Sequence, residues 1–323
     1  MAVSRAGALV LKLIVTGALL ALVFRKVDVG SLTVRLQGLH VAWAIAAIVV
    51  LFGLLLLTGI RWYFVDRSVG SGIGPWLAIR LALVGHFFNQ VLPSSVGGDG
   101  VRAWLLSREG IPIRRALASV ICDRVVALIV LTVIVACTLP MVLVVGGASI
   151  PSAVPFASVV GALALGGLLF LCFLGEASSS WLGRIALVRP VGVIIRDLSR
   201  VLFRSEVRIR VVVLSILAQA LLVLGIYMCA RALSVRFSAV HLLMLPLIML
   251  VSSVPISFAG WGLRESAMVT GLGFANIASA DALAISVSFG LAQIVVGLPG
   301  LLIAAMSRYW GTRETVEQRL ESR

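Results

Sequence analysis

The chain has 323 residues, of which 61% are hydrophobic and only 12% are charged. Soluble domains are about half apolar and about a quarter charged, so this composition excludes a sizeable soluble domain and predicts an all-α integral membrane protein. The formal net charge is +14, but the basic residues lie in the gaps between apolar blocks, where they set topology and do not indicate nucleic-acid binding.

Six apolar blocks are long enough to cross a bilayer as full helices. They cover about 8–24, 39–60, 116–145, 153–175, 209–233 and 281–306. The first block resembles a signal peptide, but it lacks a convincing cleavage site and runs directly into Arg25 and Lys26. We therefore interpret it as an uncleaved span.

Two further apolar stretches, about 76–107 and about 240–276, are broken in the middle by Gly and Pro. The breaks read PSSVGGDGVR at 93–102 and PISFAGWGLR at 255–264. Such breaks end a helix, and irregular backbone is tolerated at membrane depth only inside protein or beside a wet cavity. Each stretch is thus predicted to be a re-entrant hairpin of two half-helices. Two ordinary spans joined by a surface loop are the alternative, although the segment from Gly100 to Arg108 is too short to cross.

We interpret the chain as a single membrane domain, 1–323. The distribution of its charged residues predicts how this domain is oriented in the membrane. The segment 176–208 and the C-terminal tail are rich in Arg and are expected in the cytoplasm, together with both termini. This topology leaves Arg25, Lys26 and Arg35 outside, against the usual rule. The segment 176–208 is either an amphipathic surface helix against anionic lipid or a solvated loop.

The two breaks align without a gap, about half the chain apart. The identical pairs are Pro93 and Pro255, Ser95 and Ser257, Gly98 and Gly260, Gly100 and Gly262, and Arg102 and Arg264. Repeat one covers about 39–145 and repeat two about 209–306, and the second begins on the opposite side of the membrane. This predicts an inverted repeat, the layout of many secondary transporters.

The chemistry of each break suits an anion. A half-helix begins after each Gly-rich segment, its first amides lack partners, and its dipole favours negative charge there. Arg102 and Arg264 follow at once, so two helix tips and two guanidiniums converging on one place would bind phosphate. Alternatively, Arg102 forms a structural bridge with Asp99 or Glu109, Arg264 pairs with Glu265, or either side chain snorkels to the surface.

Other polar residues in apolar segments extend the candidate site. Asn89 is expected to cap or brace the first hairpin, and His86 to make a bundle contact rather than carry protons. Asp123 and Arg124 form a neutral local pair, or Asp123 balances the cationic site. The candidate substrate-binding residues are Asn89, Pro93, Ser95, Gly97, Gly98, Asp99, Gly100, Arg102, Asp123, Arg124, Pro255, Ser257, Gly260, Trp261, Gly262, Arg264 and Glu265.

The segment N-Q-x-L-P-S-S-x-G-G-D-G-x-R-A at 89–103 resembles the hallmark of the lysylphosphatidylglycerol synthase transmembrane-region family. This family includes the flippase-like domain of multiple peptide resistance factor proteins and standalone members. The segment 255–265 and the Asp123–Arg124 pair fit the same family. The resemblance implies a multi-pass protein of the bacterial inner membrane, or its archaeal counterpart, that moves lipids between leaflets. The chain ends at Arg323 after a short charged tail, so the aminoacyl-transferase activity of fused members is not expected.

Three classes of function compete at this point. A lipid flippase is preferred, without a cofactor, because no G-x-x-x-x-G-K-[ST] motif is present. A headgroup enzyme is less favoured: D-G-V-R-A at 99–103 resembles the start of a CDP-alcohol phosphotransferase motif, but Trp104 stands where Arg is needed and no acidic pair for a metal follows. The third class is an accessory subunit of a separate lipid-modifying enzyme. The lipid is not specified, because standalone relatives have been linked to several lipids.

Overall fold

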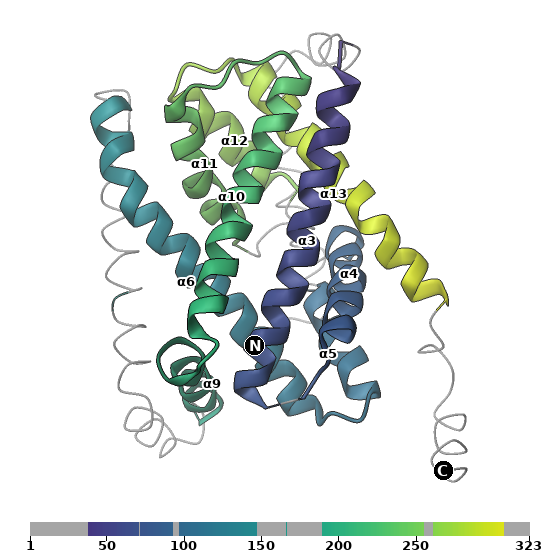
Figure 1. Ribbon diagram of the computed structural model, residues 1–323. Helices are drawn as coiled ribbons and strands as arrows, with labels where there is room; N and C mark the ends of the chain where they lie inside the picture. Colours follow the sequence, from purple (N-terminus) through teal and green to yellow (C-terminus); the bar gives the residue numbers. More distant parts are fainter. Residues whose placement is uncertain are drawn as a thin grey trace, which may run out of the picture.

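The computed structural model describes residues 38–70, 72–92, 97–146, 166, 189–254 and 261–306. Every regular element in these ranges is helical (Figure 1). The expected spans at about 8–24 and 153–175 lie outside the described residues. So do five candidate site residues, Pro93, Ser95, Pro255, Ser257 and Gly260.

The described helices form two groups. In each group a long helix is followed by two short helices and then by another long helix. The first group is α3 (Val41–Val69), α4 (Pro75–Val91), α5 (Gly97–Arg108) and α6 (Ile113–Gly146). The second group is α10 (Arg208–Ala232), α11 (Ala239–Ser252), α12 (Leu263–Gly273) and α13 (Ser279–Met306). Between them lie α9 (Arg189–Ser199) and the π-helical turn η2 (Arg200–Arg204).

The long helices α3, α6, α10 and α13 are each long and apolar enough to cross a membrane. Four of the six expected spans are therefore confirmed as spanning candidates. The first of these, α3, runs on to Val69 rather than ending near residue 60, and Gly70 then stops it in a left-handed conformation. The extra turns carry Arg61 and Asp66, which are buried and have polar partners inside the protein.

Helices α3 and α10 pack side by side and antiparallel. At one end the His40 amide donates to the Ala232 carbonyl over 2.8 Å, and at the other end the Ser68 and Ser205 hydroxyls are 2.8 Å apart. Aromatic residues mark both ends of α3, since Arg231 lies over Trp43 and Arg67 lies over Tyr63. These two rings are about 30 Å apart along a helix axis, close to the thickness of the hydrocarbon core.

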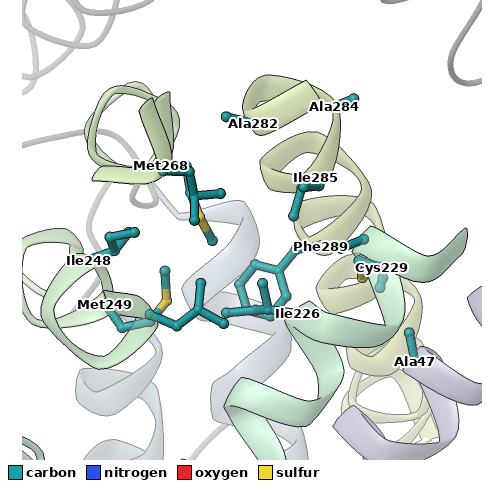
Figure 2. Packing of buried hydrophobic residues seen from close by; sticks show 14 of the residues in the cluster. Ala47, Ile226, Cys229, Ile248, Met249, Met268, Ala282, Ala284, Ile285 and Phe289 are labelled. Carbon is teal, nitrogen blue, oxygen red and sulfur yellow. The ribbon is translucent and has the colours of Figure 1, made fainter. Parts of the chain in front are cut away.

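The two groups pack on each other in a reciprocal way, the second helix of each against the last helix of the other. The second helix of the first group, α4, packs on the last helix of the second, α13, and α11 packs on α6 in the same way. The α4–α5 hairpin occupies the lower half of the view in Figure 1 and the α11–α12 hairpin the upper half. The largest apolar cluster joins α10, α11, α12 and α13, with Met249, Met268, Ile285 and Phe289 among its members (Figure 2).

The linker between the groups is helical over 189–204, which is the amphipathic alternative of the two that the sequence left open. Ile195, Leu198 and Val201 are buried against α3 and α6, whereas Arg200 and Arg204 are exposed. The apolar face therefore docks on the bundle, with Arg200 and Arg204 on the exposed side.

Candidate functional site

The first hairpin closes tightly because two glycines remove side chains where α4 meets α5. The Asn89 side-chain oxygen accepts the Gly98 amide hydrogen over 2.8 Å, so Asn89 braces the turn between the helices. A Cβ on Gly98 would overlap the Gly85 carbonyl oxygen, and a Cβ on Gly85 would overlap the aliphatic part of the Arg102 side chain. The glycines thus bring the α5 backbone, and Arg102 with it, directly against α4.

Arg102 lies in a cluster of five charged side chains from three helices, and four of the five are buried. Its Nη1 is 3.3 Å from Asp99, and its Nη2 is 3.6 Å from Asp123. Arg61 on α3 donates to Asp123 over 2.9 Å. Arg124 on α6 donates through Nε and Nη2 to the two oxygens of Asp99, over 2.6 and 3.0 Å. The guanidinium of Arg102 also stacks on Trp62, 4.0 Å from the ring centroid.

These contacts decide between the alternatives left open for Asp123. Asp123 pairs with Arg61 and Arg102, and its sequence neighbour Arg124 pairs with Asp99. Asp123 therefore balances the cationic cluster. His86 contacts the Gln293 carbonyl of α13 over 3.1 Å, which is the bundle contact expected for it.

The cluster leaves part of Arg102 unsatisfied. Three guanidiniums face two carboxylates, so the five side chains carry one excess positive charge. Arg102 is only 6% exposed, and within the part of the chain that the structure describes its buried Nε and Nη2 have no hydrogen-bond partner. Buried donors of this kind are rare, because an unmade hydrogen bond from a charged group costs free energy.

The cluster also has an open edge. The side chain of Arg124 is 49% exposed, and Gly100 at the start of α5 is exposed with open space where a Cβ would lie. A ligand approaching the Arg102 guanidinium would therefore pass Arg124 and the first turn of α5.

A second layer of hydrogen bonds holds Trp62 beneath the cluster. The Trp62 indole N–H donates to the Ser119 hydroxyl over 3.0 Å, and that hydroxyl donates to the fully buried Asp66 over 2.7 Å. The other Asp66 oxygen accepts the Ile73 amide hydrogen over 3.1 Å. This chain of contacts fixes α3 against α6 and orients the ring on which Arg102 stacks.

We expect Ser119→Ala to lower the free energy of unfolding by about 1–3 kcal/mol, because it strands the Trp62 donor and one Asp66 oxygen in the interior. Thermal or denaturant unfolding of the purified protein in detergent measures the change. Ser253→Ala is the matched control, since that exposed hydroxyl bonds only the Leu250 carbonyl of its own helix. Equal stability of the two variants would show that the network does not hold α3 on α6.

The second hairpin places Arg264 in a smaller and fully paired cluster. Its Nη2 donates to Glu265 Oε1 over 2.7 Å and its Nε to the same oxygen over 3.1 Å. Ser286 on α13 also donates to this oxygen, and the other Glu265 oxygen accepts the Gly262 amide hydrogen over 2.6 Å. Trp261 and Phe289 lie beside the guanidinium. One cation and one carboxylate leave this cluster neutral, which is the structural bridge considered for Arg264.

The structure places the two guanidiniums at different levels of α13, whereas the sequence led us to expect one shared pocket. Arg264 lies against Gly290, and Arg102 lies against Gly85 of α4. On α13, Gly297 lies beside Phe87 and Gly300 against Leu83, so the Gly85 level lies more than two helical turns, roughly 13 Å, from Gly290. Each hairpin keeps its own Arg because each packs on a different part of this helix.

The described candidate residues thus separate into two sets. Asn89, Gly97, Gly98, Asp99, Gly100, Arg102, Asp123 and Arg124 belong to the first hairpin and its cluster, and Trp261, Gly262, Arg264 and Glu265 to the second. The sequence interpretation missed Arg61, Trp62, Asp66, Ser119, Ser286 and Phe289. Arg61 and Asp66 had a usable signal, since no Pro and no Gly-rich break of the kind found at 93–102 separates them from the apolar helix before them.

The described part of the chain contains no group of three or more His, Cys, Asp or Glu residues that could hold a metal ion. No disulfide joins the cysteines within this part of the chain, Cys122, Cys137 and Cys229. The chemistry available at the two hairpins is therefore that of guanidinium and carboxylate groups, aromatic rings and helix amides.

Comparison with known proteins gives a family match over most of the chain. The family model described as the lysylphosphatidylglycerol synthase TM region matches residues 9–300. A UPF0104 membrane protein of Methanothermobacter thermautotrophicus is 31% identical over 115 residues, which is 35% of this chain and 34% of that protein. The match thus spans about a third of the length of this relative. No solved structure matches the chain.

Proposed function

Because the chain belongs to the lysylphosphatidylglycerol synthase transmembrane-region family, we propose that it moves a phosphate-bearing lipid between the leaflets of a bacterial inner membrane. The headgroup binds at the tip of the α4–α5 hairpin, on Arg102, while the acyl chains stay in the bilayer. The chain carries out no covalent chemistry on the lipid in this proposal. Both termini lie on the cytoplasmic side.

The observation that carries this proposal is the unsatisfied guanidinium of Arg102. Among the described residues, its buried Nε and Nη2 have no hydrogen-bond partner, Asp123 lying 3.6 Å from Nη2 as an ion pair, and the cluster has one excess positive charge. A phosphate oxygen would satisfy these donors and the charge together. The first turn of α5 lies beside them, and its amides and dipole favour an anion. Because Glu265 already pairs with Arg264, we assign the headgroup to Arg102 rather than to both guanidiniums.

The arrangement of the two helix groups supports transport by alternating access. Both groups have the same order of helix lengths, and their first helices, α3 and α10, run antiparallel. We interpret them as an inverted repeat, with each broken pair entering from its own side as a re-entrant hairpin. Rocking of one group against the other would expose the Arg102 cluster to each leaflet in turn.

The test is reconstitution of the purified full-length chain into liposomes containing a fluorescent phospholipid. A membrane-impermeant reductant destroys the outer-leaflet fluorescence, so lipid movement appears as a loss beyond the half that protein-free vesicles show. Mass spectrometry of the same lipids tests for covalent change. Lipid movement without modification supports the proposal. Vesicles indistinguishable from protein-free ones favour an accessory role, and a modified headgroup would favour an enzyme.

A further inference from the structure

We propose that the Arg102 cluster is selective for a single monoanionic phosphodiester, and that the Arg264 cluster binds no anion because Glu265 supplies one from within the chain. This inference rests on the proposed lipid transport and names the headgroup class that the site accepts. It also makes the two hairpins chemically unequal, with one ligand site per chain.

The geometry of the guanidinium carries the first step. In an arginine the Nε–H and the Nη2–H point the same way and form a fork that two oxygens of a carboxylate or phosphate can accept. Arg124 uses this fork for Asp99, with contacts of 2.6 and 3.0 Å. Arg264 uses the same two nitrogens for Glu265. In Arg102 these are the two nitrogens that have no hydrogen-bond partner among the described residues, although Asp123 lies 3.6 Å from Nη2.

The second hairpin shows what a filled site of this kind looks like. Glu265 bridges the Arg264 fork and the Gly262 amide, so its carboxylate lies between a guanidinium and a helix N-terminus. In the alignment of the two breaks, Ala103 stands at the position of Glu265 and Gly100 at that of Gly262. The first hairpin therefore has the Arg and the glycine but lacks the carboxylate. A phosphodiester oxygen pair takes the place that Glu265 fills in the other half.

The charge of the cluster sets the class of ligand. Arg61, Arg102 and Arg124 face Asp99 and Asp123, which leaves a charge of +1. A phosphodiester with no other ionised group brings the total to zero, whereas a phosphomonoester overshoots it. In a buried site an uncompensated charge is costly, so the neutral sum is favoured. The ammonium of a zwitterionic headgroup gains nothing, because both carboxylates already have guanidinium partners.

The test measures lipid binding to the purified full-length protein by native mass spectrometry, with dioctanoyl phosphatidylglycerol, phosphatidylethanolamine and phosphatidic acid at matched concentrations. We expect one phosphatidylglycerol per chain and at least about tenfold weaker binding of phosphatidylethanolamine, because its ammonium restores the positive charge that the phosphodiester removes. Sodium phosphate at the same concentration should not displace the lipid. Displacement by free phosphate, equal binding of all three lipids, or a stoichiometry of two would overturn the inference.

Two substitutions each remove one negative charge and keep the size and shape of the side chain. Asp123→Asn raises the cluster to +2, so preference should move from phosphatidylglycerol to phosphatidic acid. Glu265→Gln keeps an acceptor for the Gly262 amide but frees the positive charge of Arg264, so a second phosphatidylglycerol should bind. Unchanged selectivity in a folded Asp123→Asn protein, or unchanged stoichiometry in Glu265→Gln, would contradict the charge argument. If Asp123→Asn is not recovered folded, the Glu265→Gln stoichiometry decides alone.

The same samples separate this inference from the proposed function. Selective binding of one monoanionic lipid in protein that does not move lipid would retain the inference and remove the transport proposal. Transport of all three lipids at equal rates with equal binding would retain transport and remove the inference.

Discussion

Replacing Arg102 by alanine is expected to slow lipid movement at least tenfold while leaving the membrane fold intact. The substitution removes both the Nε and Nη2 donors and the excess positive charge of the cluster. A hydrogen bond to a charged group contributes about 1.5–3 kcal/mol, and about 1.4 kcal/mol corresponds to a factor of ten. The remaining charges stay balanced, since Arg61 keeps Asp123 and Arg124 keeps Asp99. This balance is why loss of activity should not come from unfolding.

The vesicle assay measures this effect, with thermal unfolding as the check on the fold. Arg108→Ala is the matched control, because it makes the same change of charge on the same helix, at a residue that stacks on Trp104 outside the charged cluster. We expect the control to move lipid at the wild-type rate. Equal rates for Arg102→Ala and the unmodified protein would exclude Arg102 as the headgroup ligand, and parallel losses in both variants would point to surface charge instead.

The second large effect is expected at the contact between α4 and α13. Gly300 is buried, and a Cβ on it would overlap the Leu83 carbonyl oxygen and the backbone next to it. Backbone atoms cannot yield as a flexible side chain can, so the two helices must separate. Overpacking a tight interior contact costs on the order of 3 kcal/mol, and a β-branched side chain has little freedom to escape. Gly300→Val should therefore lower the unfolding temperature markedly.

Unfolding of the purified variants in detergent checks this expectation. Gly53 on α3 provides the control, because nothing lies within 4 Å of a Cβ built there. Gly53→Val should unfold close to the wild-type temperature. Because α4 packs on α13 and carries the first hairpin, Gly300→Val should also reduce lipid movement. Wild-type stability of Gly300→Val would mean that α4 and α13 do not approach each other this closely.

The sequence interpretation succeeded where the signal is local. Four long apolar helices and two broken pairs between them follow from hydropathy and from Gly and Pro, which act over a few residues. The predicted span ends near residue 60, whereas α3 runs on to Val69 with Arg61 and Asp66 buried in its last turns. Charge alone does not distinguish a helix end from a helix whose charged residues find partners inside the bundle.

For the candidate site, too, the sequence predicted the residues but not the contacts between them. Arg102, Asp99, Asp123 and Arg124 could be chosen from the sequence as polar residues in apolar surroundings, but their pairing could not. Arg61 meets Asp123 across two helices, and the choice of Asp123 over its neighbour depends on which faces of α3, α5 and α6 are turned together. Likewise, the matching breaks predicted the same role for Arg102 and Arg264. In the described residues the Arg102 Nε and Nη2 have no hydrogen-bond partner, whereas Arg264 donates to Glu265.

The sequence by itself determined that this chain is a helical membrane protein, which of the described segments are long, which are broken, and which family it belongs to. Those properties depend on the water-to-lipid transfer of consecutive residues and on local backbone preference. Only the tertiary structure decided which guanidinium keeps unsatisfied donors and that the two clusters lie at different levels. Partners for a buried charge come from whichever helices pack around it, and that packing involves residues far apart in the chain.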